Sequence, residues 1–286
     1  MSSTDKFIKF IPNLFTLGNL FLGCLGIIFC FNDHIFPVQL NELDPTGKNI
    51  GVIFGFNNRL YLASFMIYAA AVLDFFDGFV ARALKAQSPI GGQLDSLADG
   101  VTFGVLPACI YFQLLSGAYH LEPGALYVPV INMIPAFLIA LCAVYRLAKF
   151  NVDERQHESF MGMPTPAMAM FAASLPLMIF TNPYMLAPLI LNKWMLYFLV
   201  IAFSWLMVSE LPMFSLKVKS FKWKGNELPV LFIIVSLILI LSMKYAGIAA
   251  SILLYVIICL AKYFLPKKKP EHETPNPDQA TSNHKL

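Results

Sequence analysis

The sequence predicts an all-α polytopic membrane protein with about eight transmembrane helices and both termini in the cytoplasm. Charged residues make up 13 % of the 286 residues, about half of the ~25 % typical of soluble domains. Hydrophobic residues make up 58 %, and the mean hydropathy is +0.66. A soluble globule of this length could not bury so much apolar surface, and a disordered chain would be richer in charge. The composition therefore favours a chain that crosses a lipid bilayer several times.

Apolar residues run in eight continuous segments, each near the ~20 residues that a helix needs to cross the hydrocarbon. Their continuity, in place of a polar–apolar alternation, argues against transmembrane strands. The first segment follows two lysines, as in a signal peptide, but it is long enough to span and no clear cleavage site follows it. The last two segments almost abut and predict a tight hairpin. The expected spans are residues 13–32, 59–82, 92–116, 127–149, 164–182, 188–209, 228–244 and 246–265.

The basic residues test this count, because cytoplasmic loops carry an excess of Lys and Arg. With the N-terminus in the cytoplasm, sixteen of the 20 Lys and Arg residues fall on the cytoplasmic side. The other four, Lys48, Arg59, Lys193 and Lys244, fall on the outer side. A missed span would scramble this imbalance. No organelle-targeting segment is apparent, so we expect a bacterial cytoplasmic membrane.

The predicted organisation is a single transmembrane catalytic domain over residues 1–265, followed by a disordered cytoplasmic tail over 266–286. An outer loop is expected at 33–58 and a basic inner loop at 210–227. Lysines interleaved with aromatic residues in the inner loop suit an anionic lipid surface, although the positive-inside rule explains them equally well. The net charge of +3 gives no reason to expect a nucleic-acid partner. The five Cys and five His show no disulfide framework and no zinc-ligand spacing.

Four aspartates lie near the cytoplasmic ends of the second and third predicted spans. Asp74 and Asp77 are three residues apart and Asp95 and Asp99 are four apart, so each pair shares one helix face. A short inner loop makes the two helices antiparallel neighbours, so the four carboxylates can converge. Carboxylates gathered in a low dielectric repel one another, and a divalent cation relieves that repulsion. Oxygen ligands favour Mg²⁺ or Mn²⁺, and four carboxylates suit a two-metal site for phosphoryl chemistry.

Small residues and one arginine accompany the carboxylates. Gly78, Ala81 and Gly91 leave room for a ligand, and Arg82 offers a planar fork for a phosphate. An ion-coupled transporter would also place aspartates within a membrane, but it has no use for Gly, Ala and Arg at these intervals. Aspartates that are merely solvated at the interface would explain one or two of the four, not the set.

The spacing reads D-x-x-D-G-x-x-A-R-x8-G-x3-D-x3-D from Asp74 to Asp99. It resembles the signature of the CDP-alcohol phosphotransferase family at every fixed position. The stretches IPNLFTLGNLFLG, DGVTFGVLPA, YRLAKFNV, GMPTPA and LMVSELPMFSLK resemble segments of the phosphatidylserine synthase branch, whose members also have about eight spans. Two positions depart from that pattern: Lys149 stands where Arg is expected, and Glu210 where Asn or a similar polar residue is expected.

The resemblance implies a metal-dependent transfer of the phosphatidyl group from CDP-diacylglycerol to the hydroxyl of L-serine, giving phosphatidylserine and CMP. It implies one or, more readily, two Mg²⁺ or Mn²⁺ ions, a homodimer among membrane lipids, and an active site that faces the cytoplasm. By resemblance, the metal ligands are Asp74, Asp77, Asp95 and Asp99, with Asp95 and Asp99 catalytic and Asp99 the general base. Nucleotide or pyrophosphate binding falls to Gly78, Ala81, Arg82 and Gly91. Asn13, Thr16 and Asn19, at one-turn spacings on the first helix, are further candidates for the nucleotide, although polar contacts between helices would explain them equally well.

The acceptor pocket is less determined by the sequence. Arg146, Lys149, Asn151 and Arg155 lie at the inner end of the fourth span, where a cation could pair with the carboxylate of serine. Anchoring by the positive-inside rule explains these residues equally well. Another alcohol, such as glycerol 3-phosphate or inositol phosphate, stays open as the acceptor, because Arg155 could supply the additional cation that a phosphate needs.

Overall fold

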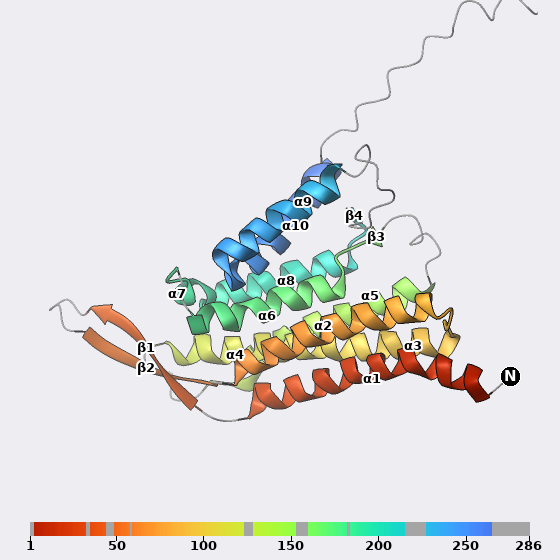
Figure 1. Cartoon of the computed structure of the whole chain (residues 1–286). Helices are drawn as coiled ribbons and strands as arrows, with labels where there is room; N and C mark the ends of the chain where they lie inside the picture. The colour runs from red at the N-terminus through yellow and green to blue at the C-terminus, as the bar shows by residue number, and fades with distance from the viewer. Residues whose placement is uncertain are drawn as a thin grey trace, which may run out of the picture.

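A computed structural model describes residues 3–32, 35–43, 49–57, 59–122, 128–152, 160–181, 184–214 and 227–264. Its long helices lie side by side, with their axes roughly aligned (Figure 1). In chain order the elements are α1 (Ser3–Phe31), β1 (Ile35–Leu43), β2 (Asn49–Asn57), α2 (Leu60–Ala83), α3 (Pro89–Asp99), η1 (Gly100–Val105), α4 (Leu106–His120), η2 (Val130–Asn132), η3 (Ile134–Phe137), α5 (Leu138–Val152), β3 (Phe160–Met161), α6 (Thr165–Thr181), α7 (Ala187–Ile190), α8 (Lys193–Val208), β4 (Pro212–Met213), α9 (Glu227–Met243) and α10 (Tyr245–Phe264).

Each of the eight predicted spans corresponds to helical structure. Five helical stretches are long and apolar enough to cross a membrane: Phe10–Phe31, Leu60–Ala83, Pro89–His120, Val130–Val152 and Tyr245–Phe264. The other three predicted spans correspond to the shorter apolar helices α6, α8 and α9. The chain is therefore a multi-pass membrane protein built of helices.

The structure adds β-structure that the all-α prediction did not include. β1 and β2 pair antiparallel within the predicted outer loop, and β3 pairs antiparallel with β4. The fourth predicted span begins with the 3₁₀ turns η2 and η3 before α5 starts. The disordered tail predicted at 266–286 and most of the basic inner loop, residues 215–226, lie outside the described residues.

The third span is interrupted by a π-helix. The side chain of Ser88 caps α3 by accepting a hydrogen bond from the Gly91 backbone N–H at 3.0 Å, and Pro89 occupies the first turn, as is usual for a helix start. Directly after Asp99 the chain widens into η1 and then returns to α-helical geometry in α4. Single π turns within α-helices are often found at functional sites.

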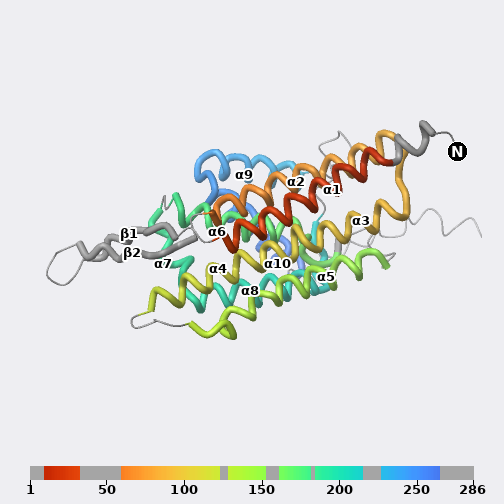
Figure 2. Tube along the Cα trace, turned by 90° about the horizontal axis from the view of Figure 1, so that it is seen from below, coloured from red at the N-terminus to blue at the C-terminus, as the bar shows by residue number. Residues whose placement is uncertain are grey.

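α1 packs closely along α2 and against η1, and the two views agree on this arrangement (Figures 1 and 2). A Cβ atom added at Gly23 would lie only 2.4 Å from Thr102 Oγ1, and one at Gly26 would lie 2.4 Å from Leu106 Cδ2. Thr102 Oγ1 in turn donates a hydrogen bond to the backbone carbonyl of Asn19 at 3.1 Å. The absence of side chains at these two positions is what lets α1 approach η1 and α4 so closely.

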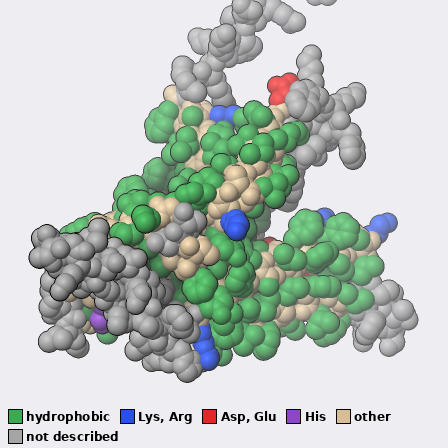
Figure 3. Space-filling model, turned by 60° about the vertical axis from the view of Figure 1, so that its left-hand side comes forward, with side chains coloured by type: hydrophobic (Ala, Val, Ile, Leu, Met, Phe, Trp, Pro, Cys, Tyr) green, Lys and Arg blue, Asp and Glu red, His purple; other side chains and the backbone are tan. Residues whose placement is uncertain are grey.

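Burial separates an inner helix from outer ones. Most of α6 is buried, as a helix with apolar residues around its whole circumference should be. In α9 only Phe232 is buried, and its other apolar residues are exposed or partly exposed. Hydrophobic side chains cover most of the face drawn in Figure 3. Such a surface suits lipid tails rather than water.

We expect Gly23→Ala to destabilise the protein. The new methyl group would overlap Thr102, and overpacking costs about 1–3 kcal/mol, more than the ~1 kcal/mol that Ala gains over Gly within a helix. Thermal unfolding in detergent would report a lowered midpoint. Gly92→Ala is the matched control, because nothing lies within 4 Å of the added atom there. An unchanged midpoint for Gly23→Ala would contradict the close packing of α1.

Candidate active site

Three of the four predicted aspartates meet at one point. Asp74 comes from α2, whereas Asp95 and Asp99 come from α3. One carboxylate oxygen from each lies within 4.8 Å of those of the other two. Asp99 is buried and the other two are partly buried. Two consecutive helices, α2 and α3, thus build a single acidic cluster, which we call the Asp triad.

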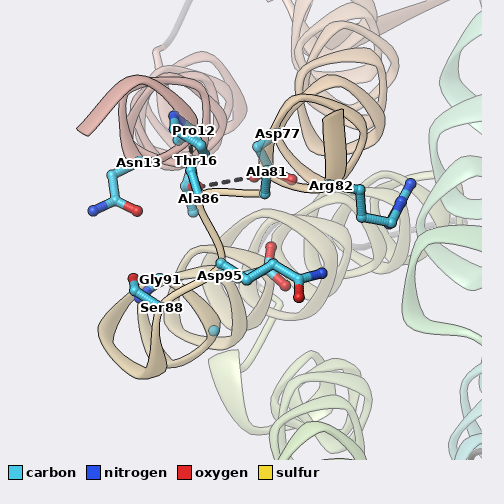
Figure 4. Close-up of a pocket in the computed structure, with 13 residues that line it drawn as sticks. Pro12, Asn13, Thr16, Asp77, Ala81, Arg82, Ala86, Ser88, Gly91 and Asp95 are labelled. Carbon is cyan, nitrogen blue, oxygen red and sulfur yellow. Dashed lines mark hydrogen bonds between the residues drawn. The ribbon is translucent and has the colours of Figure 1, made fainter. Parts of the chain in front are cut away.

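Asp77 lies outside this triad, one helical turn beyond Asp74. It is buried, and its Oδ2 accepts a hydrogen bond from Thr16 Oγ1 at 2.9 Å (Figure 4). Asp77 also lines the neighbouring pocket together with Asp95. Its role as a metal ligand stays a prediction.

The first helix orients the triad as well. Asn19 on α1 is fully buried and its Nδ2 donates a hydrogen bond to Asp99 Oδ1 at 3.0 Å. The backbone of Asn19 is held by Thr102 from η1. α1 therefore reaches two aspartates, through the Thr16 hydroxyl and the Asn19 amide, and fixes one oxygen of each.

The donor set of the triad fits a divalent cation. Three carboxylates in partly buried surroundings repel one another, and Asp95 Oδ1 is buried with no hydrogen-bond partner, which is costly for a charged oxygen. A cation among Asp74, Asp95 and Asp99 would remove both costs. Because the donors are all oxygen atoms, hard ions such as Mg²⁺ or Mn²⁺ suit them.

A pocket of about 320 Å³ adjoins the triad between α1, the end of α2 and the start of α3. Thr16 and Pro12 face Asp77 across its upper part and Asp95 lies below them (Figure 4). Gly78, Ala81, Arg82 and Gly91, the four small or basic residues of the motif, all line it. The complete lining is Pro12, Asn13, Thr16, Asp77, Gly78, Ala81, Arg82, Ala86, Gln87, Ser88, Gly91, Gly92 and Asp95.

The glycines of the motif have identifiable neighbours. A Cβ atom at Gly78 would lie 3.3 Å from Arg82 Nη1, so the guanidinium folds back over Gly78. A Cβ atom at Gly91 would lie 3.1 Å from Ser88 Oγ and 3.2 Å from Asn13 Oδ1. Both positions therefore leave polar groups free to approach the pocket. The N-terminus of α3, where the helix dipole is positive, also borders this pocket.

The residues predicted to bind the acceptor differ in their burial and in their partners. Arg146 on α5 is only 8 % exposed and its Nε has no hydrogen-bond partner. Its guanidinium lies within electrostatic range of Asp99 and of Tyr255 on α10. Asn151 Nδ2 donates a hydrogen bond to Ser96 Oγ, at 2.8 Å, which ties the end of α5 to α3 between the two aspartates of that helix. Arg155 lies outside the described residues.

Lys149 forms an ion pair that the sequence did not indicate. Its Nζ lies 3.0 Å from Glu210 Oε1, in the turn that follows α8. These two residues are the positions at which the chain departs from the phosphatidylserine synthase pattern. The structure therefore places the two departures in contact as an ion pair.

Sequence reasoning missed several pocket residues. Gln87, Ser88 and Gly92 line the pocket but were not predicted as site residues, whereas Asn13 and Thr16, predicted to reach the nucleotide, do line it. The Ser-Pro pair at 88–89 is a recognisable helix start, and it could have indicated that Ser88 and the backbone of the next turn face the ligand. Tyr255 gave no such signal, because it lies in an apolar helix about 110 residues along the chain from Arg146.

The sequence pattern of the CDP-alcohol phosphatidyltransferase family matches residues 9–206. The chain therefore belongs to this family, which confirms the resemblance drawn from the motif. The chain is similar to the CDP-diacylglycerol–serine O-phosphatidyltransferase of Bacillus subtilis, with 32 % identity over 182 residues, 63 % of this chain and 81 % of that protein.

Two further relatives extend the comparison. The protein of the same name from Mycobacterium tuberculosis is 36 % identical over 145 residues, which cover 48 % of this chain and 47 % of that protein. The chain thus spans about half the length of this mycobacterial relative. The archaetidylserine synthase of Methanothermobacter thermautotrophicus is 28 % identical over 177 residues, 61 % of this chain and 67 % of that protein.

We expect Asp74→Asn to weaken Mn²⁺ binding at least about tenfold. Outer residues of metal sites alone contribute about 10–100-fold to affinity, and Asn lacks the negative charge that the cation needs. Isothermal titration of the purified protein in detergent with MnCl₂ would measure the change. Glu122→Gln, which removes a carboxylate paired with Lys193 elsewhere in the described chain, is the control. Equal affinities for Asp74→Asn and the wild type would exclude the triad as the metal site.

Proposed function

We propose that this protein is a CDP-diacylglycerol–serine O-phosphatidyltransferase, which forms phosphatidylserine and CMP from CDP-diacylglycerol and L-serine. The observation that carries the proposal is the Asp triad beside a pocket lined by Arg82 and by the start of α3, in a chain of the CDP-alcohol phosphatidyltransferase family. The names of the bacterial relatives support serine as the acceptor.

The reaction joins the serine hydroxyl to phosphorus and releases CMP. The Oγ–P bond forms, the bond between that phosphorus and the CMP oxygen breaks, and CMP leaves with the electron pair. A primary hydroxyl is a weak nucleophile at neutral pH, so it needs a base. We assign this role to Asp99, because Asn19 holds Oδ1 of Asp99 and leaves Oδ2 to accept the proton. Asp95, whose Oδ1 has no hydrogen-bond partner, lies beside it.

Divalent cations, Mg²⁺ or Mn²⁺ and in our proposal two of them, would neutralise charge on the pyrophosphate and on the departing CMP. Asp74, Asp95 and Asp99 would hold them, and Asp77 would add a further carboxylate ligand from the side of the pocket that it lines. The protein's own groups complete the binding of the nucleotide. Arg82 would pair with a phosphate, and the N-terminus of α3 favours an anion for the same electrostatic reason.

The acceptor would lie on the other side of the triad, towards α5. Arg146 is buried and interacts with Asp99, so a serine whose carboxylate is paired with Arg146 would place its hydroxyl close to the proposed base. A buried charge without a full set of partners is costly, and a carboxylate would relieve that cost.

We further propose eight spans with both termini in the cytoplasm of a bacterium, and a homodimer in its cytoplasmic membrane. Lys85 and Lys149 lie at the same ends of α2 and α5 as the site, as the positive-inside rule requires of a cytoplasmic surface. The soluble CMP moiety and serine would then enter from water, while the acyl chains of the lipid substrate stay in the bilayer.

CMP release by the purified protein in detergent tests the proposed activity directly. With CDP-diacylglycerol and Mn²⁺, we expect CMP release that requires L-serine and stops when EDTA removes the metal. Asp99→Asn should reduce kcat at least about 100-fold, within the range that a general base contributes. Glu122→Gln should retain activity. Parallel reactions with glycerol 3-phosphate and with inositol phosphate identify the acceptor, and release with one of these instead of serine would refute the serine assignment.

Replacement of Arg146 tests the acceptor site separately. We expect Arg146→Gln to raise the KM for serine about 10–100-fold, because a hydrogen-bonded charge pair contributes about 1.5–3 kcal/mol. The KM for CDP-diacylglycerol should stay within about twofold. Thermal unfolding of the variant separates this effect from a loss of folding. Equal changes in both KM values would contradict a role in acceptor binding.

A further inference from the structure

The short strands β3 and β4 lie near the end of α5, where Glu210 just before β4 pairs with Lys149. β3 and β4 pair antiparallel at the ends of α6 and α8 (Figure 1). Two more backbone hydrogen bonds, Gly162 N–H to the Leu211 carbonyl and Met163 N–H to the Leu206 carbonyl, both 2.9 Å, join the same segments. Gly162 has a positive φ of +72°, and a Cβ atom there would lie 2.6 Å from the Met207 carbonyl oxygen. Only glycine fits this position.

The C-terminal helix fixes the other side of this element. Tyr255 Oη on α10 donates a hydrogen bond to the Phe214 carbonyl at 3.1 Å, and the rings of Phe214, Phe232 and Tyr255 pack together. The segment 209–214 is therefore held by β3 and Gly162 on one side, by the end of α8 and by α10. Its backbone places the carboxylate of Glu210 at a defined point beside α5.

Charged groups follow one another outward from the Asp triad. Arg146 interacts with Asp99, and Lys149 lies three residues further along α5, about one helical turn or 5 Å nearer its end. Lys149 then pairs with Glu210 at 3.0 Å. The order is carboxylate, guanidinium, ammonium, carboxylate. Without Glu210 the outer part of this row would carry two positive charges, and with it the sum is one.

The ion pair contributes little to stability, because its two side chains are 31 % and 67 % exposed and exposed pairs are worth about 0–1 kcal/mol. Its position matters more than its strength. Lys149 and Glu210 are 31 % and 67 % exposed, whereas Arg146 is 8 % exposed, so a solute that approached Asp99 from the end of α5 would meet this pair before Arg146. The charge of this pair therefore acts on the solute both at the entrance and, over a few ångströms, within the site.

We propose that Glu210 is a specificity-determining residue that selects a zwitterionic amino alcohol over a phosphorylated alcohol as the acceptor, an inference that rests on the proposed function. A single carboxylate on the acceptor needs one cation, which Arg146 supplies. A phosphate monoester carries about −1.5 to −2 charge at neutral pH and needs the second cation, which Glu210 occupies. The same carboxylate repels the phosphate and attracts the acceptor's ammonium group.

The test compares three variants of the full-length protein in detergent. Glu210→Gln removes the negative charge and keeps the shape of the side chain. We expect the inhibition constant of glycerol 3-phosphate, measured against serine-dependent CMP release, to fall about 5–10-fold, and the KM for serine to rise. Lys149→Gln should shift the inhibition constant in the opposite direction. Glu122→Gln, which makes the same charge change in the pair with Lys193, should leave both quantities unchanged.

A binding measurement keeps this inference separate from the proposed activity. Isothermal titration with glycerol 3-phosphate needs no turnover, and it should give tighter binding to Glu210→Gln than to the wild type. If the wild type releases no CMP with serine, the proposed function fails, while the titration still reports on Glu210. If Glu210→Gln binds glycerol 3-phosphate no better than the wild type, the selectivity role is refuted. Weakening of the contrast in high salt is expected, since the pair is partly exposed.

Discussion

The close approach of α1 to the second and third helices is the constraint on which the site depends. Glycine at position 23 lets α1 lie against Thr102, and from there Asn19 reaches Asp99 while Thr16 reaches Asp77. α2 and α3 supply the carboxylates, but α1 fixes how two of them are turned. Any widening of this contact would lengthen both hydrogen bonds together, because the same helix carries both donors. The geometry of the proposed metal site is thus a property of three helices and not of the motif alone.

The cost of charge within a membrane explains why polar groups surround the aspartates of the site. Carboxylates are costly at membrane depth unless they are paired. Here Asp77 accepts a hydrogen bond from the Thr16 hydroxyl, Asp99 accepts one from the Asn19 amide, and the Asp triad offers three carboxylates to a cation. The two sides of the triad then differ in charge. The pocket side has Arg82 and the positive end of α3, and the side towards α5 has a row in which one cation is balanced by Glu210.

Much of the fold could be predicted from the sequence, because continuous apolar segments report directly on helices in a membrane. All eight expected segments are helical, and the i, i+3 and i, i+4 spacing of the aspartates indicated the cluster that Asp74, Asp95 and Asp99 form. What could not be predicted depends on contacts between distant segments. Asp77 lies apart from the triad and accepts a hydrogen bond from Thr16 of α1, and the pairing of Lys149 with Glu210 depends on how the chain folds back after α8. Apolar residues alternate along β2, at positions 50, 52, 54 and 56, which is a strand signal within the segment that was expected only as an outer loop.

The π turn after Asp99 has a consequence for how this helix can vary. Successive residues of an α-helix are rotated by about 100° around the helix axis. The wider π turn η1 changes this rotation between α3 and α4. The face that carries Asp95 and Asp99 is therefore rotated relative to the packed face of α4. One continuous span thereby carries two independent faces, a polar one for chemistry and an apolar one for packing. Substitutions on either face leave the other in register, whereas loss of a single residue between 100 and 105 would turn the two faces out of step. Within this span, insertions and deletions are far more restricted than replacements.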